Sequence, residues 1–162
     1  MKSTVIKLLT ILALTVQAFA AEKDHKHEKK EAGPNGGRVI TAVEPHLEFL
    51  VTKDRKVEIS ALTEELKASK LTGQVITVTA GDRSKPTKLE FKEKDGKLIS
   101  TNNLPEGNDY PVSVSIKADA KAKATYEKFN LDFSKCPSCE HPEYACVCNH
   151  DDHEGHDHDK KK

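Results

Sequence analysis

The sequence has no tryptophan, only 5% aromatic residues and no net charge, because 26 lysines and arginines match 26 aspartates and glutamates. A nucleic-acid-binding protein usually carries an excess of positive charge, and a polytopic membrane protein needs several apolar runs of about 20 residues. The sequence has neither feature. The composition therefore argues against both classes, and 162 residues leave room for one modest domain with polar ends.

The first twenty residues have the layout of an export signal. Residues 1–7 include two lysines, residues 8–19 are almost wholly apolar, and Ala18 and Ala20 are small residues at the two positions that signal peptidase reads. A membrane-spanning helix needs about 20 apolar residues, so this run is too short to serve as an anchor. We therefore expect a signal peptide over residues 1–20, export to the periplasm or secretion, and no membrane attachment after cleavage.

The mature chain divides by composition into three parts. Residues 21–33 are mostly charged or histidine, with His25 and His27 among them, and we expect a disordered leader because they cannot bury enough apolar surface to offset their ordering entropy. Residues 34–133 show short apolar runs with a period of two, which predict a folded domain. Residues 134–162 hold all four cysteines and a stretch rich in His and Asp, and we interpret them as a metal-binding tail.

The middle part has the pattern of an all-β domain. Alternating apolar and polar residues, bounded by Gly, Pro, Asn or Asp, predict strands over residues 38–43, 47–51, 57–62, 74–80, 87–92, 97–101, 110–117 and 124–133. This spacing favours an Ig-like antiparallel β-sandwich of about seven to eight strands over a βαβ fold. Residues 63–71 are the one stretch that resembles a helical turn, with Thr63 as its N-cap, and we interpret them as a connection between the sheets.

The same part offers no catalytic constellation. Catalysis needs a nucleophile near a base, or paired carboxylates in a cleft, whereas residues 34–133 contain no cysteine and a single histidine, His46. His46 stands at the start of a predicted strand, where a polar strand end and a metal ligand are both open interpretations. We therefore expect that the protein is not an enzyme.

One motif in this part resembles a known family. The run Pro-Asn-Gly-Gly-Arg-Val at residues 34–39, followed by a strand at 46–51 and a hairpin into 56–59, resembles small exported β-sandwich domains associated with heavy-metal efflux adaptors in Gram-negative bacteria. The similarity covers about residues 34–80. It implies a periplasmic protein with a role in metal binding or efflux. Position 35 is Asn where His is common in that family, and the resemblance offers His46 as a candidate ligand.

The clearest functional signal comes from the cysteines. Cys136 and Cys139 form a C-x2-C pair, and Cys146 and Cys148 form a C-x-C pair seven residues further on. Thiolates are ligands that zinc and copper(I) prefer, and four of them complete a tetrahedral zinc site. The C-x-C spacing departs from that of zinc ribbons and suits copper(I), so the expected cofactor is zinc or copper(I).

Histidines near the cysteines add to this signal. The stretch after Cys148 alternates histidines with carboxylates, a pattern that forms a flexible, multidentate metal binder. The candidate histidine ligands are His141, His150, His153, His156 and His158. A flexible tract of this kind predicts fast, weak binding of several ions, as in buffering or hand-over, because a catalytic site would need a fixed open coordination position.

Two alternatives to metal binding follow from the same cysteines. An even number of cysteines in an exported chain typically forms disulfides, which predicts a disulfide-stapled, exported Ig-like interaction module without metal function. Thiol–disulfide exchange at the Cys-Pro-Ser-Cys run would require a helix N-terminus that lowers the thiol pKa, and no such setting is visible.

The sequence as a whole thus predicts a periplasmic transition-metal-binding protein that acts as a buffer or as an accessory to heavy-metal efflux or homeostasis. The expected partners are metal ions and a periplasmic efflux adaptor, with no nucleic acid and no membrane.

Overall fold

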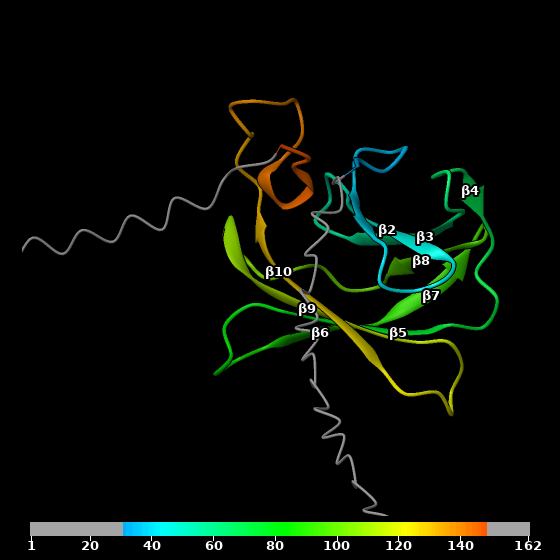
Figure 1. The fold of residues 1–162 in the computed structure, drawn as a ribbon. Helices are drawn as coiled ribbons and strands as arrows, with labels where there is room; N and C mark the ends of the chain where they lie inside the picture. Colours follow the sequence, from blue (N-terminus) through cyan, green and yellow to red (C-terminus); the bar gives the residue numbers. More distant parts are fainter. Residues whose placement is uncertain (1–30, 149–162) are drawn as a thin grey trace, which may run out of the picture.

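Two antiparallel sheets form the fold in the computed structural model, which describes residues 31–148 (Figure 1). The six-stranded sheet has the order β1 (Arg38–Ile40), β2 (His46–Val51), β3 (Val57–Leu62), β8 (Lys97–Ser100) and β7 (Phe91–Lys94), with β4 (Ala68–Ser69) paired to β3. The four-stranded sheet has the order β10 (Thr125–Asp132), β9 (Asp109–Lys117), β5 (Val75–Ala80) and β6 (Thr87–Leu89). A short 3-10 helix, η1 (Glu143–Ala145), follows β10. The predicted all-β antiparallel sandwich is confirmed.

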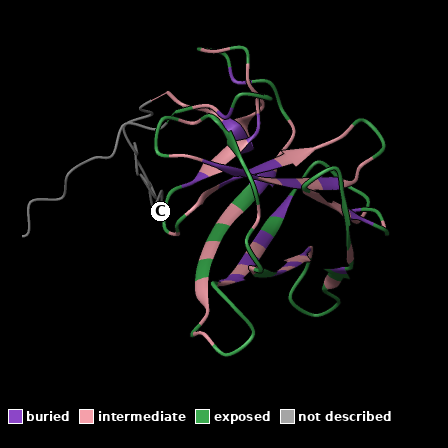
Figure 2. Cartoon of the chain, turned by 90° about the vertical axis from the view of Figure 1, so that its right-hand side faces the viewer, coloured by how far each residue is buried: buried purple, intermediate pink, exposed green. Residues whose placement is uncertain are grey.

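The core lies between the sheets and is built by the period-two pattern of the strands. Ile59 in β3 and Val114 in β9 are at most 1% exposed, while their sequence neighbours are only half-buried. Figure 2 shows this alternation as bands of buried and exposed residues along the strands. The pattern arises because successive side chains of a strand point to opposite faces of the sheet. No helix in residues 31–148 is long and apolar enough to cross a membrane.

The structure divides the predicted strand at residues 87–92 into two. Residues 87–89 pair with β5 in the four-stranded sheet, while residues 91–94 pair with β8 in the six-stranded sheet. Between them, Glu90 donates its main-chain N–H to the side chain of Asn102 (2.9 Å) instead of to a strand. The chain therefore crosses from one sheet to the other at this residue. This split and the unpredicted strand β4 together explain why the described part has more strands than the sequence predicts.

Residues 63–67 form a hairpin turn into β4 and not a helical turn, and the stretch as a whole connects the six-stranded sheet to the four-stranded one, as the sequence predicts. The N–H of Thr63 donates to the oxygen of Lys67 (2.8 Å), and Leu66 adopts a φ of 57°, which a right-handed helix does not allow. The turn brings β4 back onto the end of β3. Thr63 does act locally as a cap, because its hydroxyl accepts the N–H of Lys67 (3.3 Å).

Packing against the sandwich begins before residue 34 and continues after residue 133. Ala32 pairs with Arg38 and Gly33 is buried, while Tyr144 and Ala145 belong to the hydrophobic core. In Figure 1 the orange C-terminal segment lies beside the end of β10. The cysteine-bearing segment up to residue 148 is thus packed onto the domain. The predicted export signal, residues 21–30 of the leader and the histidine-rich stretch from residue 149 lie outside the described residues.

Candidate metal centre

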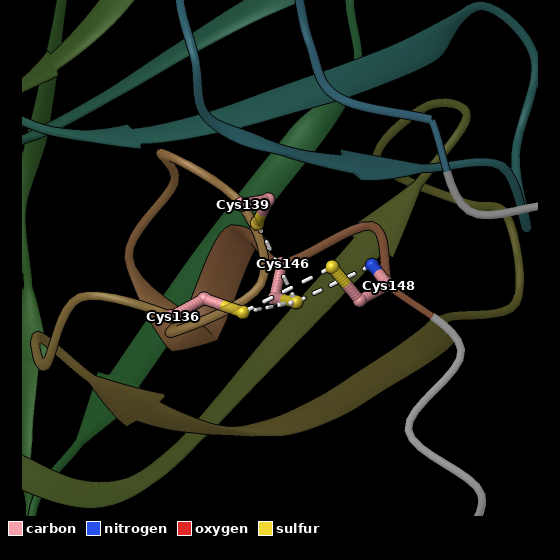
Figure 3. A group of neighbouring side chains, drawn as sticks. All are labelled: Cys136, Cys139, Cys146 and Cys148. Carbon is pink, nitrogen blue, oxygen red and sulfur yellow. Dashed lines mark hydrogen bonds between the residues drawn. The ribbon is translucent and has the colours of Figure 1, made fainter.

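The first cysteine pair sits on a short loop that follows β10. The N–H of Cys136 donates to the oxygen of His141 (3.0 Å), and the N–H of Glu143 donates to the oxygen of Ser134 (2.9 Å). These two bonds close the loop like the end of a hairpin. Cys136 and Cys139 are thereby presented to the same side (Figure 3).

The second pair follows η1, a short turn that brings the chain back to this loop. The N–H of Cys146 donates to the oxygen of Glu143 (3.1 Å) and ends the turn. The N–H of Cys148 then donates to the sulfur of Cys146 (3.3 Å). A main-chain donor aimed at a sulfur favours its thiolate form, which is the form that binds metal.

The four cysteine sulfurs converge on one point. Figure 3 shows them turned toward one another, and all four lie within 4.8 Å of one another. The sulfurs are 3.3 Å apart in Cys136–Cys146, 3.8 Å in Cys139–Cys146 and 3.9 Å in Cys136–Cys148. A zinc–sulfur bond of about 2.3 Å in a tetrahedron requires sulfurs about 3.8 Å apart. The spacing therefore suits a single four-coordinate ion.

The four cysteines of this cluster form no disulfide, and they differ in exposure and acidity. Cys136 is 2% exposed, and the other three are half-buried. A hydrogen bond from the main chain of His141 lowers the pKa of Cys139 to about 7, whereas burial raises the pKa of Cys146 to about 12 and also raises that of Cys148. Thiolates this close together repel one another. A bound cation offsets that repulsion and takes the place of the thiol protons. The cluster can therefore hold a metal ion such as zinc.

Tyr144 anchors the cluster to the core between the two cysteine pairs. Its ring packs edge-on against Phe49 (6.4 Å between centroids) and Phe133 (6.0 Å), and the residue is 4% exposed. Its hydroxyl accepts the main-chain N–H of Val51 (3.2 Å). The loop that carries the sulfurs is therefore placed by the sandwich itself.

The histidines predicted as ligands are not part of this cluster in the described residues. The group of possible ligand atoms in residues 31–148 consists of the four cysteine sulfurs. His141 contributes its main chain to Cys136 and Cys139. The side chain of His46 lies 3.0 Å from the oxygen of Val43 and 3.2 Å from a carboxylate oxygen of Glu44. The remaining candidates lie outside the described residues: His25, His27, His150, His153, His156 and His158.

Glu48 has a structural role that the sequence pattern does not predict. Its side chain is fully buried, and its carboxylate accepts the main-chain N–H of Asn35 and of Gly37 (2.9 Å each) and the side-chain amide of Asn35 (2.7 Å). A Cβ at Gly37 would lie 2.6 Å from the oxygen of Phe49, so only glycine allows this close approach. The Pro-Asn-Gly-Gly turn thus binds a carboxylate of its own chain. Alternation with the buried Leu47 and Phe49 predicts a solvated Glu48, and only the covering turn makes it buried.

Comparisons with protein-family models, with curated proteins and with solved structures returned no match. The site is therefore interpreted from its own geometry.

Proposed function

We propose that this protein is an exported transition-metal-binding protein in which Cys136, Cys139, Cys146 and Cys148 hold one zinc ion. The observation that carries the proposal is the convergence of the four sulfurs within 4.8 Å, with separations of 3.3–3.9 Å where two sulfurs are in hydrogen-bond contact. Zinc sites of four thiolates are closed, because no coordination position remains for water or substrate. The centre thus holds an ion and does not act on a substrate.

Zinc is favoured over copper(I) by the number of sulfurs. Copper(I) accepts two or three thiolates, whereas the four sulfurs of this cluster are mutually close enough for a four-coordinate ion. The main-chain contacts to Cys139 and Cys146 support the charged sulfurs that zinc requires. Copper(I) remains the competitor against which zinc is to be tested.

The wider role that we propose is metal buffering or an accessory function in heavy-metal efflux or homeostasis. Residues 1–20 have the pattern of an export signal, and the His- and Asp-rich stretch continues directly from Cys148. A tight cysteine site next to a tract of weak ligands suits a protein that gathers ions and retains one. The motif at residues 34–39, with its resemblance to periplasmic metal-efflux domains, supports the same compartment and the efflux adaptor as partner.

Metal titration of the reduced mature chain tests this function. We expect one tightly held zinc ion per chain and additional weak ones, measured by competition with a chromophoric chelator and by native mass spectrometry. Cys139→Ser combined with Cys148→Ser should remove the tight ion and leave the weak ones. Alanine at His150, His153, His156 and His158 should remove the weakly bound ions and leave the tight one.

The outcomes of this titration separate the alternatives. Four reduced thiols with no tight ion would overturn the proposal. A protein that is isolated from its export compartment four protons light in mass would carry two disulfides, which favours the interaction module. Copper(I) that displaces zinc at equal concentration would keep the site and change its metal.

A further inference from the structure

A side chain from the N-terminal part of the domain contacts the segment between the two cysteine pairs. The guanidinium of Arg38, in β1, donates from Nη1 to the main-chain oxygen of Tyr144 in η1 (3.4 Å). Tyr144 stands two residues before Cys146 in the chain. The contact therefore fixes the backbone that delivers the second pair of sulfurs.

Two further contacts orient this guanidinium. Nη2 forms an ion pair of 2.8 Å with Glu127 in β10, and both side chains are only about a quarter exposed. The guanidinium carbon also lies 4.6 Å from the centre of the Phe129 ring. A guanidinium held by a carboxylate and by a ring face has little rotational freedom left, so Nη1 is a fixed donor.

The backbone that carries Arg38 is fixed as well. Arg38 follows the turn that the buried carboxylate of Glu48 holds at Asn35 and Gly37, and it pairs with Phe49 of β2. On the same turn, a Cβ built on Gly36 would lie 3.8 Å from the ring of His141. Residues 34–39 thus lie beside both halves of the centre.

We propose that Arg38 is a positioning residue of the metal centre. It sets the place of η1 so that the sulfurs of Cys146 and Cys148 meet those of Cys136 and Cys139. This inference rests on the proposed zinc function of the cluster. Because coupling between two sites is reciprocal, zinc binding must in turn strengthen the hold of Arg38 on η1.

A matched pair of variants tests the role of Arg38. Arg38→Met keeps the aliphatic stem and removes the donors, while the control Lys97→Met removes a longer ion pair with Glu58 (3.4 Å) between β8 and β3. The probe is zinc alone, added to the reduced full-length chain against a competing chelator. We expect zinc affinity to fall about tenfold in Arg38→Met and by less than about twofold in Lys97→Met. Tenfold is the lower end of the effect typical for residues that orient metal ligands without binding the ion.

Thermal unfolding with and without zinc separates positioning from simple stabilisation. If Arg38 positions the centre, Arg38→Met reduces the rise in unfolding midpoint that zinc produces. If Arg38 only stabilises the fold, the midpoint falls equally in both states and the inference is overturned. Should Arg38→Met fail to fold, Glu127→Gln removes the orienting carboxylate and should weaken zinc binding in the same direction by a smaller factor; unchanged affinity there would also refute the inference. A wild-type chain that binds no zinc would instead refute the proposed function.

Discussion

Glu48→Ala removes the buried carboxylate that organises the turn at residues 33–37. The carboxylate accepts three hydrogen bonds of 2.7–2.9 Å, two of them from the main chain of Asn35 and Gly37. A buried donor left without an acceptor costs about 1–3 kcal/mol. The side-chain amide of the exposed Asn35 can turn to water, so the main-chain donors dominate the loss, that of Gly37 being buried and that of Asn35 partly buried. We expect a decrease in the free energy of unfolding of about 3–4 kcal/mol.

Urea denaturation of the metal-free protein measures this loss. With a slope of about 1.5 kcal/mol per molar urea, the midpoint should fall by about 2–2.7 M. Glu48→Gln keeps one acceptor oxygen but sets an NH2 group against the Asn35 amide, so its effect should be intermediate. Glu58→Gln is the control, because Glu58 has one contact at 3.4 Å and is partly exposed, and it should change stability by less than about 0.5 kcal/mol. A change below about 1 kcal/mol for Glu48→Ala would refute the account of the turn.

Three further predictions concern Tyr144 and the cysteines. Tyr144→Ala should lower the free energy of unfolding in urea by about 3–5 kcal/mol, because it removes a core ring. Tyr144→Phe should lower it by about 1 kcal/mol, because it loses only the hydrogen bond from Val51. Equal effects would contradict this packing. Burial raises the pKa of Tyr144 and of Tyr110, so the stability from their neutral forms is complete below the unfolded pKa of about 10 and is lost as pH rises toward the higher folded values. Thermal midpoints from pH 8 to 11 should therefore fall above about pH 10, and fall less in Tyr144→Phe, relative to its own midpoint at pH 8. Zinc binding at neutral pH should release protons from Cys146 and Cys148, because their raised pKa keeps these thiols protonated, and zinc affinity should therefore weaken as pH falls. Titration calorimetry in buffers of different ionisation enthalpy counts the released protons. A count of zero would contradict thiolate ligation.

The features that the sequence predicts correctly are those encoded by local periodicity and spacing. Alternation in runs such as residues 57–62 and 110–117 depends only on which face of a strand is buried, so the sandwich could be predicted. The grouping of the four cysteines also followed from their spacing and ligand chemistry. Neither inference required knowledge of distant contacts.

The features that the sequence missed depend on contacts between distant residues. Glu48 is buried because a turn from residues 33–37 covers it, and Tyr144 enters the core because the loop after β10 folds back onto β2. The break at Glu90 depends on Asn102, twelve residues further on. A polar residue in a strand pattern gives no local sign that it will find three donors elsewhere. Such positions require the assembled fold.

The uneven exposure of the four sulfurs has a kinetic consequence. Cys136 is 2% exposed, whereas Cys139, Cys146 and Cys148 are only half-buried. An incoming acceptor that replaces the ligands one at a time should therefore meet the three half-buried cysteines before the buried Cys136. Exchange of the bound ion with an acceptor should therefore be faster than spontaneous dissociation, and its rate should rise with acceptor concentration. Such a centre can bind its ion with high affinity at equilibrium and still transfer it rapidly to an acceptor.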